Sequence, residues 1–305
     1  MSLINQDAVD IRRKIWDGII PIRIVLAPDE AREIDTVEPF YFNAPRVSYL
    51  PLYYNQIISY FKPFLRDAST ADSFEWWLEF ENVPLKWNLP IGLAYDIMTG
   101  LDPTQVDHTA NHELSSSSLS SSSLASFFLP WSLVFHYNNY PQSLILRLPS
   151  INIMMNHWIN LIKEADFIRR GNANMIMSLS KTDSDDLWSA VVSHNFETFW
   201  KITRKVLPPD PCSSLRNVPI KIYLPSGNKV LQSLVSPMIS SREPHTVGTA
   251  LHQHLPHLFP SRRTCLLARP ILHGVVVGMT TPLADLLYEC MYTDGYLHIA
   301  ISMIS

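Results

Sequence analysis

The stretches IPIRIVL (residues 20–26) and VPIKIYL (residues 218–224) decide the interpretation of this sequence, because they are two copies of one pattern. Each alternates branched apolar residues with other side chains, as in a strand that buries one face. The similarity continues in the same order further along, in PIGLAYDIM and PLADLLYECM (90–98 and 282–291) and in WSLVFHY and YLHIAIS (131–137 and 296–302). The same structural unit therefore occurs twice in the chain.

The unit contains a hairpin, a helix, further strands, a short helix and a closing strand. In the first copy we predict strands at 19–27 and 40–50, a helix at 52–65, two short strands broken near Pro84, a short helix at 91–98 and a strand at 131–141. In the second copy the matching segments are 218–224, 229–238, 246–259, 264–279, 282–291 and 296–302. A hairpin with a helix across one sheet face and a closing strand predicts a ubiquitin-like β-grasp domain, so the fold class is α+β.

A long amphipathic helix lies between the two units, in PSINIMMNHWINLIKEADFIRRG (residues 149–171). Ser150 suits the N-cap and Gly171 suits a left-handed C-cap. At about 100° per residue the apolar side chains form one stripe around Trp158, and Lys163 points roughly 140° away from it. We therefore expect Lys163 to lie in water, weakly paired with Asp166.

The rest of the chain falls into predictable parts. We predict an N-terminal helix in residues 1–17, a first ubiquitin-like domain at 18–141, a helix-rich domain at 142–207, a Pro-rich linker at 208–216 and a second ubiquitin-like domain at 217–305. The helix-rich domain has a second long helix at 184–207, which the following prolines end. The serine-rich segment at about 100–128 has no apolar periodicity, which predicts a flexible insertion, either a plain surface loop or a phosphorylated one.

Composition and motifs exclude several classes of protein. Hydrophobic residues make up 47% of the chain, enough for real cores, and a net charge of −4 offers no overall attraction to nucleic acid or to an anionic membrane, so any such contact needs a local patch. Cys212, Cys265 and Cys290 are spaced for neither a disulfide framework nor a metal site, so we expect reduced thiols in a cytoplasmic protein. We find no segment that would span a membrane, no nucleophile or phosphate-binding motif, and no cofactor or metal site.

Two further observations limit the role of the chain. The three histidines of LHQHLPH (251–257) lie on different helical faces, so a metal site there is disfavoured. The chain ends in HIAISMIS, without the Gly-Gly tail of an activated ubiquitin-like modifier. A protein with ubiquitin-like units but neither a catalytic site nor such a tail is expected to be a receiver or a scaffold, not an enzyme.

Six dispersed blocks resemble the autophagy protein 5 family, in that family's order: WDGIIPIRIVLA (16–27), PRVSYLPL (45–52), VPLKWNLPIGL (83–93), IKEAD (162–166), FETFWKITRK (196–205) and VPIKIY (218–223). They cover nearly the whole chain, and together they are far more specific than any one of them. The resemblance implies two ubiquitin-like domains flanking a helix-rich domain. The serine-rich insertion departs from the compact members of the family.

The resemblance also implies a function. The lysine of the matching K-E-A-D motif maps to Lys163 and would accept autophagy protein 12 through an isopeptide bond. The conjugate would bind a helix of autophagy protein 16 in an inter-domain groove. It would then act as an E3-like complex in the lipidation of autophagy protein 8 to phosphatidylethanolamine, during autophagosome formation at the pre-autophagosomal membrane.

Two other hypotheses remain open. The chain could be an interaction module that binds a helical partner without forming an isopeptide bond. Peripheral membrane contact is a further hypothesis, motivated by five basic residues in two clusters: Arg12, Arg13 and Lys14, and Arg169 and Arg170.

Overall fold

The computed structural model describes residues 6–32, 37–66, 76–100, 129–207, 215–225 and 229–304. The serine-rich segment 101–128, Cys212 and most of the Pro-rich linker lie outside these residues.

The first ubiquitin-like domain begins after helix α1 (Gln6–Trp16) and contains β1 (Ile19–Leu26), β2 (Phe40–Pro45), a short 3-10 turn η1 (Leu50–Tyr53), α2 (Tyr54–Phe61), η2 (Lys62–Phe64), β3 (Trp77–Phe80), β4 (Val83–Pro84), α3 (Ile91–Thr99) and β5 (Trp131–His136). The helical region contains α4 (Ile151–Arg170), α5 (Asn174–Met177), α6 (Lys181–Val192) and α7 (Phe196–Val206). The second ubiquitin-like domain contains β6 (Val218–Tyr223), β7 (Val230–Val235), β8 (Met238–Ser240), β9 (Glu243–Pro244), α9 (Val247–His254), β10 (Ala268–Leu272), β11 (Val275–Val276), α10 (Leu283–Cys290) and β12 (Leu297–Met303).

The two main sheets have the same topology. The strand orders are β2-β1-β5-β3-β4 and β7-β6-β12-β10-β11, which match strand for strand. In both sheets the first and last strands of the unit lie parallel at the centre, β1 with β5 and β6 with β12, and the hairpin partner of the first strand lies at the edge. The predicted repeat and the α+β class with two β-grasp units are confirmed.

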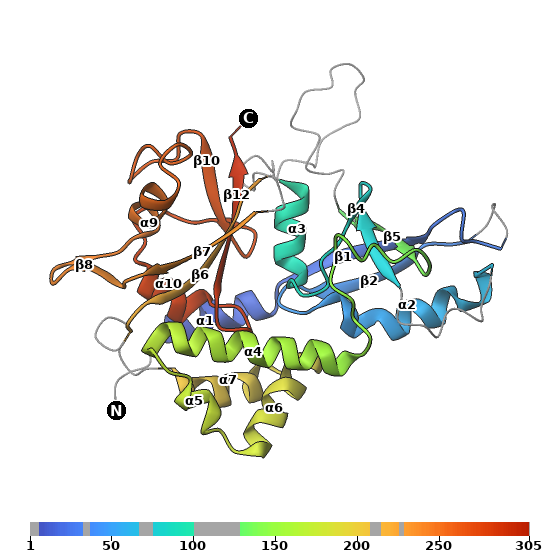
Figure 1. The fold of residues 1–305 in the computed structure, drawn as a ribbon, viewed down its shortest axis with the longest axis horizontal. Helices are drawn as coiled ribbons and strands as arrows, with labels where there is room; N and C mark the ends of the chain where they lie inside the picture. Colours follow the sequence, from blue (N-terminus) through green and yellow to red (C-terminus); the bar gives the residue numbers. More distant parts are fainter. Residues whose placement is uncertain are drawn as a thin grey trace.

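Helix α3 lies between the two sheets and belongs to both cores (Figure 1). Ile91, Ala94 and Tyr95 pack in the core of the first domain, whereas Leu93 packs in the core of the second. Every residue from Ile91 to Asp96 is buried. A helix that is apolar on all sides must be covered on all sides, so α3 holds the two ubiquitin-like domains together.

The helical region lies along one side of both domains, with α4 running across them (Figure 1). Its core includes Trp158 of α4, which packs against Trp188 of α6 with ring centroids 5.3 Å apart. Trp16, at the end of α1, enters the same core and lies 4.9 Å from the ring of Phe199 of α7. The N-terminal helix is therefore fixed to the helical region by an aromatic contact.

Several predicted elements are shorter in the structure, as in the helix predicted at 246–259, which ends at His254. Two other differences follow from the backbone conformation. The single helix expected at 184–207 is two helices, because His194 has a positive φ of 53° and Asn195 caps a new helix by accepting a hydrogen bond from the Thr198 amide. The break expected near Pro84 lies earlier, at Glu81 and Asn82, whose positive φ values form the tight turn between β3 and β4.

Candidate functional site

Lys163 lies in the second half of α4, on the side of the helix that faces away from Trp158. Its side chain is partly exposed, so it is more covered than the sequence suggested. Among the residues that the structure describes, Lys163 makes no hydrogen bond or ion pair. One turn further on, Phe167 is 58% exposed. The surface around the amine is therefore a partly apolar helix face with one unpaired cation.

The ends of α4 differ from each other. Gly171 adopts the predicted left-handed C-cap, with φ of 81°, and its amide donates to the Phe167 carbonyl. Ser150 occupies the N-cap position but makes no capping hydrogen bond with its side chain. Arg216 lies beside the C-terminal end of the helix: a Cβ built on Gly171 would lie 2.8 Å from the Arg216 Nη1 atom.

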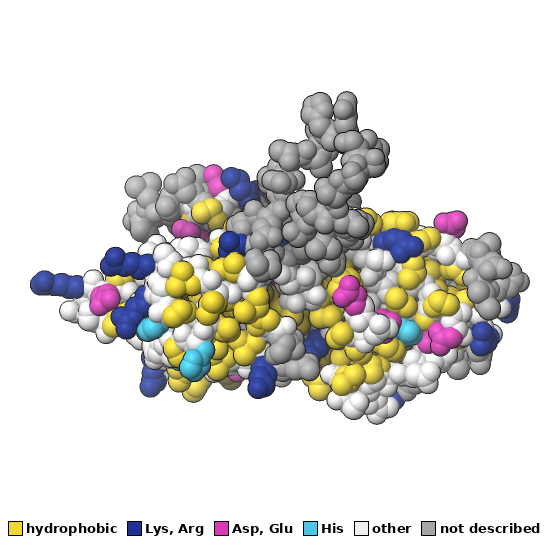
Figure 2. Space-filling model, turned by 90° about the horizontal axis from the view of Figure 1, so that it is seen from above, with side chains coloured by type: hydrophobic (Ala, Val, Ile, Leu, Met, Phe, Trp, Pro, Cys, Tyr) yellow, Lys and Arg dark blue, Asp and Glu magenta, His cyan; other side chains and the backbone are white. Residues whose placement is uncertain are grey.

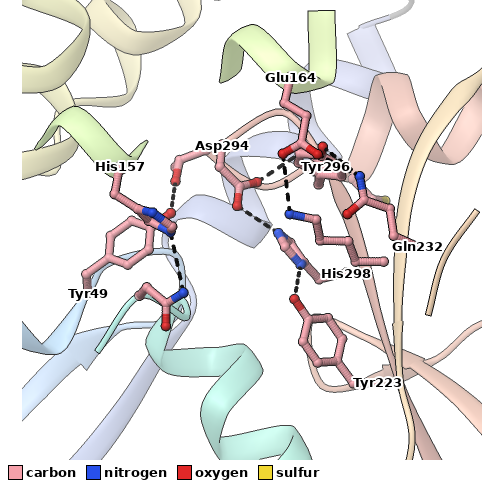
Figure 3. A network of polar contacts seen from close by, with 12 residues as sticks. Tyr49, His157, Glu164, Tyr223, Gln232, Asp294, Tyr296 and His298 are labelled. Carbon is pink, nitrogen blue, oxygen red and sulfur yellow. Dashed lines mark hydrogen bonds and ion pairs between the residues drawn. The ribbon is translucent and has the colours of Figure 1, made fainter. Parts of the chain in front are cut away.

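The residue after Lys163 ties α4 to the second ubiquitin-like domain. Gln232 of β7 donates to Glu164 Oε1 over 2.8 Å, and Lys221 Nζ of β6 lies 4.0 Å from Glu164 Oε2 (Figure 3). The Lys221 ammonium also lies 4.0 Å from the ring centroid of Tyr296. Because Glu164 is exposed, each contact stabilises the fold only slightly, but together they fix the rotation of the helix.

The next residue brings the helix close to the loop before β12. Ala165 is fully buried, and a Cβ built on Gly295 would lie 3.2 Å from the Ala165 Cβ atom. Gly295 also has φ of 83°, a conformation that glycine adopts without steric cost. A small residue on α4 and a glycine opposite it therefore allow the two backbones to approach closely.

Asp166 binds inside the helical region and not to Lys163. Its carboxylate is fully buried, accepts a hydrogen bond from the Ile176 amide of α5 over 3.3 Å, and lies 3.8 Å from Arg170 Nε. The predicted pairing of Asp166 with Lys163 is therefore replaced by contacts that hold α5 against α4. The amine of Lys163 is left without this carboxylate.

Arg169 is not a surface residue, which corrects its prediction as a membrane contact. Its side chain is 2% exposed, its Nη1 atom lies 3.9 Å from Met291 Sδ, and its carbonyl accepts from the Arg216 amide. Burial lowers the pKa of Arg169 to about 10, although Asp166 partly opposes the shift. Arg170 donates to the Val206 carbonyl of α7 and is largely covered. This pair joins structural elements of the folded chain.

The other predicted basic cluster lies on α1. Arg12 lies over the Trp200 ring at 4.0 Å and donates to the Tyr288 carbonyl. Arg13 lies over the Phe196 ring at 4.4 Å and pairs with Glu197. Lys14 is exposed. Arg12 and Arg13 are thus engaged with α7 and α10, and membrane contact by this cluster stays a prediction.

A buried polar network lies beneath α4 in the second domain (Figure 3). His298 of β12 contacts Asp294 over 2.8 Å through Nε2 and the Tyr223 hydroxyl over 2.8 Å through Nδ1. Burial disfavours the Asp294 carboxylate, but His298, the Tyr296 amide and the Lys221 ammonium together outweigh this effect and keep the pKa of Asp294 below its ordinary value. These groups satisfy one another in the interior, which fits a structural role.

Sequence reasoning missed a groove between α1 and the second domain. A cavity of about 400 Å³ is lined mainly by apolar side chains of α1, β10, β11 and α10, with Lys14 and Arg46 beside them. Ile15 of α1 lies on one wall, and Val275 of β11, which is 64% exposed, lies on the other. The walls of the groove come from segments that are distant in the sequence, so no local pattern predicts it. The apolar residues on one side of α1 were the one sign in the sequence that this helix contacts another surface.

An ion pair beside the groove links the first ubiquitin-like domain to a turn of the second. Arg46 Nη2 lies 2.5 and 2.6 Å from the two Asp96 carboxylate oxygens, and the Gly274 amide also donates to Asp96. Burial raises the pKa of Asp96, although Arg46 opposes this shift. The β10–β11 turn of the second domain is therefore locked onto the end of β2 and α3 in the first.

The thiols and histidines offer no reactive centre in the described residues. Burial raises the pKa of the Cys290 thiol to about 12 and also raises that of Cys265, so neither is a thiolate near neutral pH. No group of three histidine, cysteine or acidic side chains in this part of the chain could hold a metal ion. Within the same residues, no helix combines the length and apolar character needed to cross a bilayer.

Comparison with known proteins agrees with this architecture. Three family models match in succession: autophagy protein ATG5, UblA domain, at residues 15–137; its alpha-helical bundle region at 151–209; and its UblB domain at 217–301. The chain belongs to the autophagy protein 5 family. Autophagy protein 5 of Penicillium rubens is 40% identical over 318 residues, covering 96% of this chain and 97% of the relative. Autophagy protein 5 of Aspergillus fumigatus is 40% identical over 321 residues, with 96% and 95% covered.

The fold of the autophagy protein 5 family is also seen in a solved structure. The crystal structure of Kluyveromyces marxianus Atg5 superposes with a TM-score of 0.75 at 19% sequence identity and covers 96% of this chain and 99% of that chain. Membership of the family assigns the chain a role in autophagy, and we use UblA and UblB below for its two ubiquitin-like domains.

Proposed function

We propose that Lys163 is the acceptor for autophagy protein 12. The observation that carries the proposal is the contrast between Lys163 and its neighbours: Glu164, Ala165 and Asp166 all hold α4 in place, whereas the Lys163 amine has no partner among the described residues. The motif thus presents one available amine on a helix fixed to UblB and to the helical region.

The reaction needs only an accessible amine from this chain. The uncharged ε-amine attacks the thioester carbonyl of a modifier carried by a conjugating enzyme, the enzyme's thiolate leaves, and the proton of the amine passes to water. The product is an isopeptide bond. A helix that cannot rotate keeps the amine at a constant position relative to the enzyme, which lowers the entropic cost of the encounter.

A denaturing gel of cell extract tests this assignment. The chain is expected to carry a covalent upshift of the size of the modifier, which Lys163→Arg abolishes. Lys181→Arg is a matched control, because Lys181 is an exposed lysine of the same helical region. An upshift that persists in Lys163→Arg would show that another residue is the acceptor.

We further propose that the groove between α1 and UblB receives the helix of autophagy protein 16. Its apolar walls suit the apolar face of an amphipathic helix, and Lys14 at its rim suits an acidic residue on that helix. The conjugate with autophagy protein 16 would then act as an E3-like, non-catalytic assembly. It would promote transfer of autophagy protein 8 to phosphatidylethanolamine, in the cytoplasm at the pre-autophagosomal membrane.

Valine variants on the two edges of the UblB sheet test the groove. Val275→Asp, on β11, places a charge in the groove and is expected to abolish co-purification with the helical partner. Val230→Asp, at the exposed start of β7, is the control. Retained partner binding by Val275→Asp would rule out this groove.

The same two experiments separate the alternative function. An interaction module without conjugation would lose its partner in Val275→Asp but show no upshift at all. The groove itself favours this alternative as a second candidate, since helix binding needs no reaction at Lys163.

A further inference from the structure

The loop between α9 and β10 of UblB exposes arginine and leucine side chains together. Arg262 and Arg263 are exposed, Leu266 is 58% exposed and Leu267 is 48% exposed. Large apolar side chains that gather at a surface, rather than lying singly, mark a contact with another molecule or with a membrane.

The C-terminal strand ends beside this loop. The Ile304 amide donates to the Leu267 carbonyl over 3.0 Å, and Met303 of β12 pairs with Ala268 at the start of β10. Met303 is 46% exposed. The side chains of Leu266, Leu267 and Met303 therefore come from adjacent backbone segments, and we call these three with Arg262 and Arg263 the UblB tip.

The backbone of the tip is fixed. Ser261 Oγ accepts hydrogen bonds from the Arg263 amide over 3.3 Å and the Thr264 amide over 3.2 Å. The loop also packs closely on α9, since a Cβ on Gly248 would lie 1.9 Å from the Arg262 carbonyl oxygen. The exposed side chains thus stand on a rigid turn, which reduces the entropy lost on binding.

The loop of the tip carries basic side chains and no acidic ones. The sequence contains no aspartate or glutamate from residue 244 to residue 284, although the chain as a whole is acidic. Within the described residues, the guanidinium groups of Arg262 and Arg263 have no ion pair. Figure 2 shows hydrophobic side chains gathered over the left-hand lobe, where UblB lies, with basic and histidine side chains at the margin. This surface suits an anionic, partly apolar target.

We propose that the UblB tip is a membrane-binding surface that takes anionic lipid headgroups. The leucines and Met303 enter the boundary between headgroups and acyl chains, while Arg262 and Arg263 bind the lipid phosphates. Two arginines and two exposed leucines on one fixed turn fit a lipid surface, because such a surface offers phosphates and an apolar layer side by side.

The tip leaves the proposed acceptor accessible. The C-terminal end of the chain, beside the tip, lies on the upper side of Figure 1, whereas α4 lies on the lower side. A membrane at the tip would therefore leave Lys163 and its attached modifier in the cytoplasm. The proposal rests on the peripheral localisation proposed above and is independent of the role of Lys163.

Vesicle flotation of the purified chain tests the proposal. The probe is vesicles of equal parts phosphatidylcholine and phosphatidylserine, with pure phosphatidylcholine vesicles for comparison. The chain is expected to float with the anionic vesicles, less so at high salt. Arg262→Gln with Arg263→Gln should weaken binding about thirtyfold. Leu266→Ser with Leu267→Ser should weaken it about tenfold.

Two control variants carry matched changes elsewhere. Leu144→Ser with Leu146→Ser changes two leucines that are each 63% exposed, and Lys201→Gln with Arg204→Gln changes two exposed basic residues of α7. Both are expected to float like the unchanged chain. The upshift at Lys163, measured in parallel, should persist in every variant.

Two results would overturn the proposal. If the unchanged chain does not float with anionic vesicles at low salt, the tip does not bind a membrane, and an acidic protein becomes the better target. If the chain floats but the tip variants float equally well, another surface binds the lipid.

Discussion

Removal of the Asp96 carboxylate should destabilise the junction of the two ubiquitin-like domains strongly. In the ion pair with Arg46, the Asp96 side chain is 5% exposed and the Arg46 side chain 15% exposed. Arg46 Nε already lacks a hydrogen-bond partner among the described residues. Asp96→Ala would leave the guanidinium buried without its counter-ion, which costs about 3–5 kcal/mol. Because Arg46 keeps some contact with water, we expect a value near the lower end.

A second variant separates the charge effect from lost packing. Arg46→Met combined with Asp96→Leu removes both charges and keeps apolar volume, so it should cost much less than Asp96→Ala alone. Urea unfolding, followed by the fluorescence of the eight tryptophans, gives the free energy of unfolding of each variant. A loss below about 1 kcal/mol in Asp96→Ala, or equal losses in the two variants, would refute the assignment of this pair as a buried latch.

Three further predictions concern local features. Burial lowers the pKa of His273 from 6.5 to about 3, so between these pH values the imidazole is protonated in the unfolded chain but not in the folded one. The stability of the fold therefore falls as the pH decreases from about 6.5 to about 3. Thermal melts across this pH range should show a smaller fall in melting temperature for His273→Asn than for the unchanged chain. Asn195→Ala should lower the free energy of unfolding in urea by about 1 kcal/mol, and Ser150→Ala should hardly change it, because Asn195 makes a capping hydrogen bond with its side chain and Ser150 does not. Equal losses in the two variants would contradict this assignment. Gly295→Ala should lower the melting temperature more than Gly100→Ala. Both have positive φ, but an added Cβ meets Ala165 at Gly295 and nothing within 4 Å at Gly100; equal shifts would exclude crowding as the cause.

The repeated units were predictable because their signals are local. Alternation in residues 20–26 determines which side chains face the core, and the repeat of this pattern at 218–224 then implies the same strand order twice, although β6 is buried on both faces. The C-terminal end of α4 was predictable for a similar reason, since Gly171 signals a left-handed cap.

The break between α6 and α7 shows where periodicity misleads. The apolar positions before and after residues 193–195 are compatible with one helix, and the break contains neither glycine nor proline. Asn195 was the missed signal, because asparagine is a strong N-cap residue.

The burial of Arg169 could have been predicted from the same helical geometry that placed Lys163. At about 100° per residue, Arg169 lies only about 20° from Trp158, on the buried stripe. Its charge led to the wrong expectation, since an unpaired arginine is seldom buried. The groove, in contrast, depends on how three segments meet, which local patterns do not contain.

The sharing of α3 by two cores has a consequence for fragments of this chain. A fragment that contains UblB alone would lack α3, so the part of the UblB core that Leu93 covers would be exposed. A fragment that contains UblA alone would keep α3 but expose its Leu93 face to water. Either piece would present apolar surface that cellular quality control recognises. We therefore expect truncated products to be degraded rapidly, so that cells retain the protein as a whole chain or not at all.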